Sequence, residues 1–123
     1  MTEIIFKDWR TAFEFDRLDK KLKQIVAYAI TTAADMGIAR LVVTSIQRDD
    51  GGVHSTHPVR GIDLVPEDRD VTSMETIRSA VNDEWDYGKQ NSSIEVCPPV
   101  RHGTAPHVHL QCRDETTRRE VSS

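Results

Sequence analysis

The strongest pattern in the chain is a helical repeat of apolar residues between positions 16 and 36. The apolar positions that share one stripe are Leu18, Leu22, Ile25, Val26, Ala29 and Ala33. Charged and polar residues fill the positions between them, as in an amphipathic helix. Asp16 is suited to cap the start of this helix, and Gly37 is suited to the left-handed turn that ends one. The pattern therefore predicts a helix over residues 16–36 whose apolar stripe packs into a core.

A second helix is predicted from Thr72 to Gly88. Its first residues, Thr72-Ser73-Met74-Glu75, have the form of a capping box, in which a hydroxyl and a carboxylate bond the free amides of the first turn. The apolar stripe of this helix consists of Met74, Ile77, Val81 and Trp85. Trp85 is accordingly predicted to be a core residue.

Four short runs rich in β-branched residues predict strands, at residues 39–47, 60–65, 92–97 and 107–112. A loop rich in Gly, Asp and Pro separates the first two runs. The resulting order is helix, strand, strand, helix, strand, strand. This order predicts an α+β domain, with a small antiparallel β-sheet and two main helices packed on one face.

The 123 residues are expected to form one domain over residues 1–115, followed by a polar, flexible C-terminal tail at 116–123. The formal net charge of −4 gives no electrostatic case for binding nucleic acid. No apolar run approaches the ~18 residues that a spanning helix needs. The N-terminus also lacks the basic and apolar regions of a signal peptide. We therefore expect synthesis in the cytoplasm and no insertion into a membrane.

The two cysteines, Cys97 and Cys112, lie in predicted strands and in no Cys-x-x-Cys pair. Their placement favours small buried apolar side chains. A cross-strand disulfide and a metal thiolate are the alternatives.

The run "PHVHL" places two histidines, His107 and His109, two positions apart on a predicted strand. Side chains alternate along a strand, so both imidazoles point to one face while Val108 and Leu110 point to the other. We expect the valine and leucine to lie under the helices. The face with two imidazoles and Gln111 is expected to be open to solvent or to a ligand.

The stretch "GGVHSTHPVRGID" adds two further histidines, His54 and His57, and the carboxylate of Asp63. A histidine, a carboxylate and a second histidine from neighbouring strands make a three-ligand zinc site. An open fourth position is typical of catalytic zinc. Nitrogen and carboxylate ligands favour Zn²⁺ over an iron–sulfur or blue-copper site.

Three features together resemble the zinc peptidases that cleave D-amino-acid peptide bonds in bacterial cell walls. The strand ending in "VTSIQR" resembles the strand before that family's first ligand. "GVHSTHPVRGIDL" resembles the family's histidine, small-residue turn and aspartate, and "PHVHL" resembles its His-x-His strand. This is the D-alanyl-D-alanine carboxypeptidase and L-alanyl-D-glutamate endopeptidase family, whose fold is shared by hedgehog-like domains. The likeness spans roughly residues 39–112.

The resemblance implies that Asp63 and His109 hold Zn²⁺ and that His107 is the catalytic acid or base. The first ligand would be His54, because Gly52-Val53-His54 resembles the family's approach to that position. His57 is the alternative, although Pro58 constrains its backbone. His57 lies six positions before Asp63, and His54 lies nine positions before it. Neither spacing equals the family's own.

Arg60 matches a basic residue that often precedes the aspartate in this family. Arginine binds carboxylates through two parallel hydrogen bonds, so Arg60 could hold a substrate carboxylate. Orienting Asp63 is the alternative role, and the sequence does not separate the two.

The function implied by the resemblance is hydrolysis of peptidoglycan stem peptides, in an endolysin-like or carboxypeptidase-like reaction. Small phage-encoded members of the family exist, and an enzyme of this kind could reach the cell wall during lysis. The alternative is a non-catalytic structural or phage assembly protein with the same fold. The imperfect spacing before Asp63 motivates that alternative.

Overall fold

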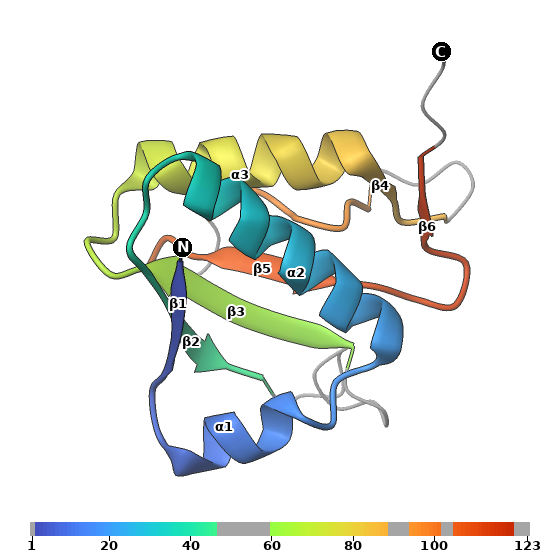
Figure 1. Cartoon of the computed structure of the whole chain (residues 1–123). Coiled ribbons are helices and arrows are strands. Elements are labelled where there is room, and N and C mark those ends of the chain that lie inside the picture. Colours follow the sequence, from blue (N-terminus) through green and yellow to red (C-terminus); the bar gives the residue numbers. More distant parts are fainter. Residues whose placement is uncertain (1, 47–59, 89–93, 102–104, 120–123) are drawn as a thin grey trace.

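The computed structural model describes residues 2–46, 60–88, 94–101 and 105–119 (Figure 1). Its main sheet has the strand order β1-β2-β3-β5. These strands are β1 (Glu3–Phe6), β2 (Arg40–Ser45), β3 (Gly61–Pro66) and β5 (Val108–Gln111). The predicted α+β class is confirmed.

The sheet is mixed instead of wholly antiparallel, because β1 pairs in parallel with β2. The other two pairings, β2 with β3 and β3 with β5, are antiparallel. Parallel neighbours need a long crossover. The chain between β1 and β2 supplies one with the helices α1 (Trp9–Phe15) and α2 (Lys20–Asp35). The sequence pattern did not predict β1 or α1.

Helix α2 carries the predicted apolar stripe but begins at Lys20. Its cap is Asp19, whose side chain accepts a hydrogen bond from the Lys21 amide at 2.8 Å. Asp16 instead ends α1, so its predicted capping role was wrong. Gly37 has a φ of 81° and supplies the left-handed turn after α2, as predicted.

Helix α3 spans Val71–Glu84 and is capped by Asp70, which accepts from the Ser73 amide at 3.0 Å. An Asp cap therefore replaces the predicted capping box. The helix ends before Gly88 because the chain turns extended at Trp85–Asp86, which form strand β4. Trp85 is 4% exposed and belongs to the core, as predicted.

Residues 116–119 pack against the domain and are not a tail. Thr116 is fully buried, and Thr117–Arg118 form strand β6, which pairs antiparallel with β4. Gly88 permits this contact, since it has a φ of 95° and a Cβ there would lie 2.5 Å from the Glu115 carbonyl oxygen. Residues 120–123 lie outside the described part of the chain.

The predicted strand at 92–97 is not formed by its described residues, 94–97. The segment nevertheless runs beside β5. The Val96 carbonyl accepts from the Gln111 amide at 2.9 Å, and the Val100 carbonyl accepts from the His107 amide at 3.0 Å. Two consecutive prolines, at positions 98 and 99, lack the N–H groups that a regular ladder requires.

Alternation along β3 and β5 divides the sheet into two unlike faces. The apolar face carries the fully buried Ile62, Leu64, Val108 and Leu110, which share one core with α2 and α3. The predicted burial of Val108 and Leu110 is thereby confirmed. Asp63 and His109 point to the other face, because they alternate with these residues.

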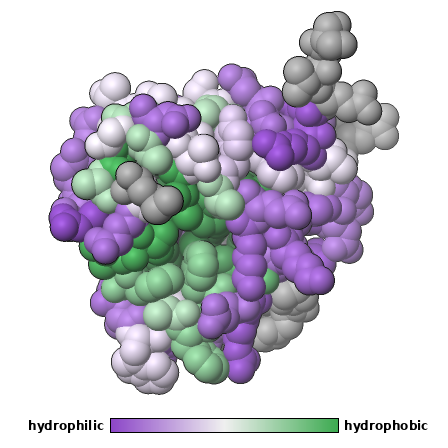
Figure 2. All heavy atoms as spheres, in the orientation of Figure 1, coloured by the Kyte–Doolittle hydropathy of each residue, from purple (hydrophilic) through white to green (hydrophobic). Residues whose placement is uncertain are grey.

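The surface seen from the helix side is also divided. Figure 2 shows hydrophobic side chains gathered around β1 and α2, and hydrophilic ones over the C-terminal strands. Partly buried residues at the margin of the core include Ile4, Ile30 and Ile38. Within the described residues, none of the helices has the length and apolar character that crossing a membrane would demand.

Candidate metal centre

The site is built around a buried carboxylate–imidazole pair. The register of β3 and β5 sets Asp63 directly opposite His109. His109 Nδ1 lies 2.6 Å from Asp63 Oδ1. Asp63 is 1% exposed and His109 is 9% exposed. Of the two alternatives expected for this face, open to solvent or open to a ligand, His109 therefore does not fit the first.

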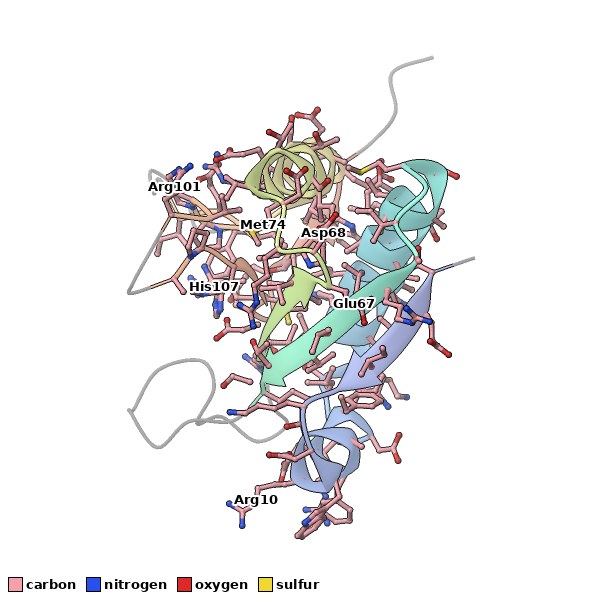
Figure 3. All side chains as sticks on the ribbon, turned by 90° about the vertical axis from the view of Figure 1, so that its left-hand side faces the viewer. Arg10, Glu67, Asp68, Met74, Arg101 and His107 are labelled. Carbon is pink, nitrogen blue, oxygen red and sulfur yellow. The ribbon has the colours of Figure 1, made fainter. Side chains whose placement is uncertain are left out.

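His107 joins the pair from the residue before β5. Its Nε2 lies 3.6 Å from the same Asp63 Oδ1, and its side chain is 18% exposed. Figure 3 shows His107 on the side of the sheet away from α2, below the segment that carries Arg101. The two histidines thus share a face, and both imidazoles approach one carboxylate oxygen.

Each imidazole also has its second nitrogen next to a carbonyl-type oxygen. His107 Nδ1 lies 2.9 Å from the Ala105 carbonyl oxygen, and His109 Nε2 lies 3.2 Å from Gln111 Oε1. A carbonyl oxygen only accepts hydrogen bonds, so His107 Nδ1 is placed to donate to the Ala105 carbonyl. For His109 the donating nitrogen depends on the tautomer, because Asp63 Oδ1 at Nδ1 is an acceptor as well. Histidines that bind metals commonly donate their other N–H group in this way.

This geometry gives His109 an oxygen acceptor at both ring nitrogens. A neutral imidazole has one N–H and cannot donate to both Asp63 and Gln111. Two arrangements satisfy both contacts: a ring with two protons, or a ring whose Nδ1 faces a cation shared with Asp63. At 2.6 Å the two atoms are in direct contact, as in a hydrogen bond donated by Nδ1. Imidazole nitrogen and carboxylate oxygen are also zinc ligand types, so the donor set fits a metal ion by its chemistry.

The described residues do not complete a metal site by themselves. Among residues 2–46, 60–88, 94–101 and 105–119, no three His, Cys, Asp or Glu side chains form a group that could hold a metal ion. Both candidate first ligands, His54 and His57, lie outside the described residues. A third ligand would have to come from that part of the chain.

Arg60 lies away from the pair. Its Nη2 donates to Asp114 Oδ1 at 2.7 Å, and its Nε is 3.7 Å from Asp19 Oδ2. Arg60 and Asp63 are an odd number of positions apart, so their side chains leave the chain on opposite faces. Neither predicted role of Arg60, holding a substrate carboxylate or orienting Asp63, has support in this arrangement.

The two cysteines are free and buried, as predicted. Burial raises the pKa of the Cys97 thiol and of the Cys112 thiol to about 12. Among the described residues, neither cysteine belongs to a group of three side chains that could hold a metal ion.

A polar network beyond the ligands was not predicted from the sequence. Gln111 Nε2 donates to the Glu95 carbonyl at 2.8 Å. The Glu95 carboxylate is held by Arg78 at 2.6 Å and by Asn82 at 3.1 Å. The i, i+4 spacing of Arg78 and Asn82 shows that they share a face of α3, but nothing in the sequence identifies their partner.

A comparison with models of known protein families finds none that matches this chain, and no curated protein matches it either.

Proposed function

We propose that the chain is a zinc-dependent peptidase that acts on the stem peptides of bacterial peptidoglycan. The observation that carries the proposal is the convergence of two imidazoles on one buried carboxylate. Asp63 Oδ1 lies 2.6 Å from a nitrogen of His109 and 3.6 Å from a nitrogen of His107. The choice of peptidoglycan as substrate comes from the resemblance of "GVHSTHPVRGIDL" and "PHVHL" to the cell-wall peptidases.

Asp63 and His109 would hold the zinc ion, together with His54 or, as the alternative, His57. The bound ion supplies Lewis acidity, which polarises a peptide carbonyl and makes water more acidic. A site of this kind needs two firm ligands on rigid elements. The adjacent strands β3 and β5 would supply them, because Asp63 and His109 lie directly opposite each other in the register of these strands.

His107 is suited to move the proton. The Ala105 carbonyl holds the proton of Nδ1, so Nε2 of the neutral ring faces the site with its lone pair. The side chain is more exposed than that of His109, at 18% against 11%. His107 Nε2 would take a proton from the attacking water and return it to the leaving amine.

The direct test is release of new amino groups from purified peptidoglycan. We expect activity that EDTA abolishes and Zn²⁺ restores, and that is absent in His109→Ala. Gln24→Ala, at an exposed position on α2, is the matched control and should keep full activity. Full activity of His109→Ala would contradict the proposal. Zinc binding without any hydrolysis would instead favour the non-catalytic structural or phage assembly role.

A further inference from the structure

We propose that a hollow between α2 and the paired strands β4 and β6 binds a small aromatic carboxylate. The hollow has a volume of about 740 Å³, and its lining includes Tyr28 on α2, Trp85 on β4 and Arg118 on β6. Ligand pockets typically measure about 300–1,000 Å³. Figure 1 shows β4 and β6 beside each other past the end of α3. The proposal is independent of the metal centre, because α2 packs on the apolar face of the main sheet while Asp63 and His109 point to the other face.

The charges around the hollow favour an anion. Two cationic side chains, Lys21 and Arg118, line it, and none of the described residues in the lining is acidic, although the formal net charge of the whole chain is −4. Lys21 Nζ donates to the Asp114 carbonyl oxygen at 2.7 Å, and this neutral acceptor does not cancel the ammonium charge. Arg118 Nε donates to the Glu84 carboxylate.

The guanidinium of Arg118 has further donors available. Its two Nη groups have no hydrogen-bond acceptor within the described part of the chain. Two parallel N–H groups of a guanidinium match the two oxygens of a carboxylate. We therefore expect the anionic group of the ligand to pair with the Arg118 Nη groups.

Two aromatic rings beside Arg118 favour a ligand with a flat apolar body. The guanidinium carbon of Arg118 lies 5.7 Å from the centroid of the Tyr28 ring and 5.6 Å from the centroid of a Trp85 ring. Contacts of this kind attract a cation to an aromatic face. An anion paired with Arg118 would thus have aromatic carbon next to it, and aromatic groups pack favourably on one another. An inorganic phosphate or sulfate has no apolar body to use these contacts.

Trp85 adds a hydrogen-bond donor that lacks a partner. The side chain is 4% exposed, and its indole Nε1 has no acceptor among the residues that the structure describes. Most buried N–H groups in proteins have an acceptor. A carboxylate oxygen seated beside Trp85 would be an acceptor of the right kind, so the indole N–H is also the natural reporter of the site.

The experiment is titration of the metal-free full chain with naphthoate, followed by calorimetry and by the ¹⁵N–¹H NMR signal of the Trp85 indole. The chain has two tryptophans, and Trp9→Phe, at an exposed position, identifies the signal of Trp85. We expect naphthoate to shift this signal. It should bind roughly tenfold more tightly than its neutral amide, naphthamide, because it adds hydrogen bonds to a charged group. Arg118→Gln should lose this preference for the anion.

Two further variants make the test decisive. Arg40→Gln is the matched control and should bind naphthoate as the native chain does, because Arg40 is an exposed arginine held by Glu3 and Glu67. Lys21→Gln should also weaken naphthoate binding, and it keeps the test valid if Arg118→Gln does not fold. The proposal would be overturned by equal affinity for naphthoate and naphthamide, by an unchanged Trp85 signal, or by native affinity in both Arg118→Gln and Lys21→Gln.

Discussion

The two faces of strands β3 and β5 are built from alternating residues of the same short segments, yet they differ in chemistry. One face carries Leu64 and Leu110, fully buried against the helices. The other carries Asp63 and His109, also buried but held by polar contacts. Burial alone therefore does not separate the core residues from the residues of the proposed site. The distinction lies in whether a buried group is satisfied by packing or by a specific polar partner.

The largest expected effect is on the polar face. His107→Ala should lower the rate of peptidoglycan hydrolysis by about 10²–10⁴-fold, the usual contribution of a general acid or base. The free energy of unfolding should change little, since the His107 side chain is partly exposed. Rate assays and urea denaturation measure the two quantities. A fall in the free energy of unfolding large enough to explain the lost activity would show that His107 has a structural role and not a catalytic one.

The apolar face should respond in the opposite way. Leu64→Ala should lower the free energy of unfolding by about 2–5 kcal/mol, because it leaves a cavity among fully buried neighbours. Zinc bound per folded molecule should stay at the native value. Leu64→Met, which conserves volume, should cost less than about 1.5 kcal/mol. Loss of zinc from folded Leu64→Ala would show that the two faces are not independent.

Asn82 lies on α3, which packs on the apolar face, and it bonds Glu95 and Cys97 in the segment that contacts Gln111 on the polar face. Its removal should therefore affect both faces. Asn82→Ala breaks its hydrogen bonds to Glu95 and to both backbone groups of Cys97. We expect the free energy of unfolding to fall by about 1–3 kcal/mol and the NMR signals of the His109 ring nitrogens to shift. Asp83→Ala, at an exposed neighbouring position, is the control and should stay within about 0.5 kcal/mol. Unaltered NMR signals of the His109 ring nitrogens in Asn82→Ala would show that α3 does not support the site.

The smallest expected effect is a pH dependence from a core thiol. Burial raises the pKa of Cys97 from 9.0 to about 12. Above pH 9 the unfolded chain loses this proton while the folded chain keeps it, so stability falls as pH rises toward 12. Between pH 8 and pH 10, the native protein should lose about 1 kcal/mol more than Cys97→Ala. The free energies of unfolding are measured by urea denaturation at both pH values. An equal loss between pH 8 and pH 10 in the native protein and in Cys97→Ala would contradict the burial of this thiol.

Local pattern was sufficient for the elements that repeat over many residues. The stripe of α2 and the alternation around His109 are strong signals, and both predicted the side that packs into the apolar core. The four residues of β1 carry no comparable repeat, and β1 was missed. The run before Pro98 has strand-like composition, but the two prolines prevent a regular ladder.

The candidate site was predictable only in part. Residue type and strand alternation made Asp63, His107 and His109 candidates, and the family resemblance supplied their proposed roles. Their mutual distances depend on the register between β3 and β5, which no local pattern specifies. The roles of Gln111 and Asn82 depend on contacts with Glu95 and Cys97, and the separate placement of Arg60 depends on its ion pairs with Asp19 and Asp114.

The most direct measurement is the zinc content of the full chain, purified without added metal and then titrated with Zn²⁺. Native protein should bind one zinc ion per chain, and Asp63→Asn and His109→Ala should each lose it while remaining folded. The Gln24→Ala control should bind as the native protein does. A native chain that takes up no zinc, or an Asp63→Asn chain that binds it equally well, would contradict a metal ion held between Asp63 and His109.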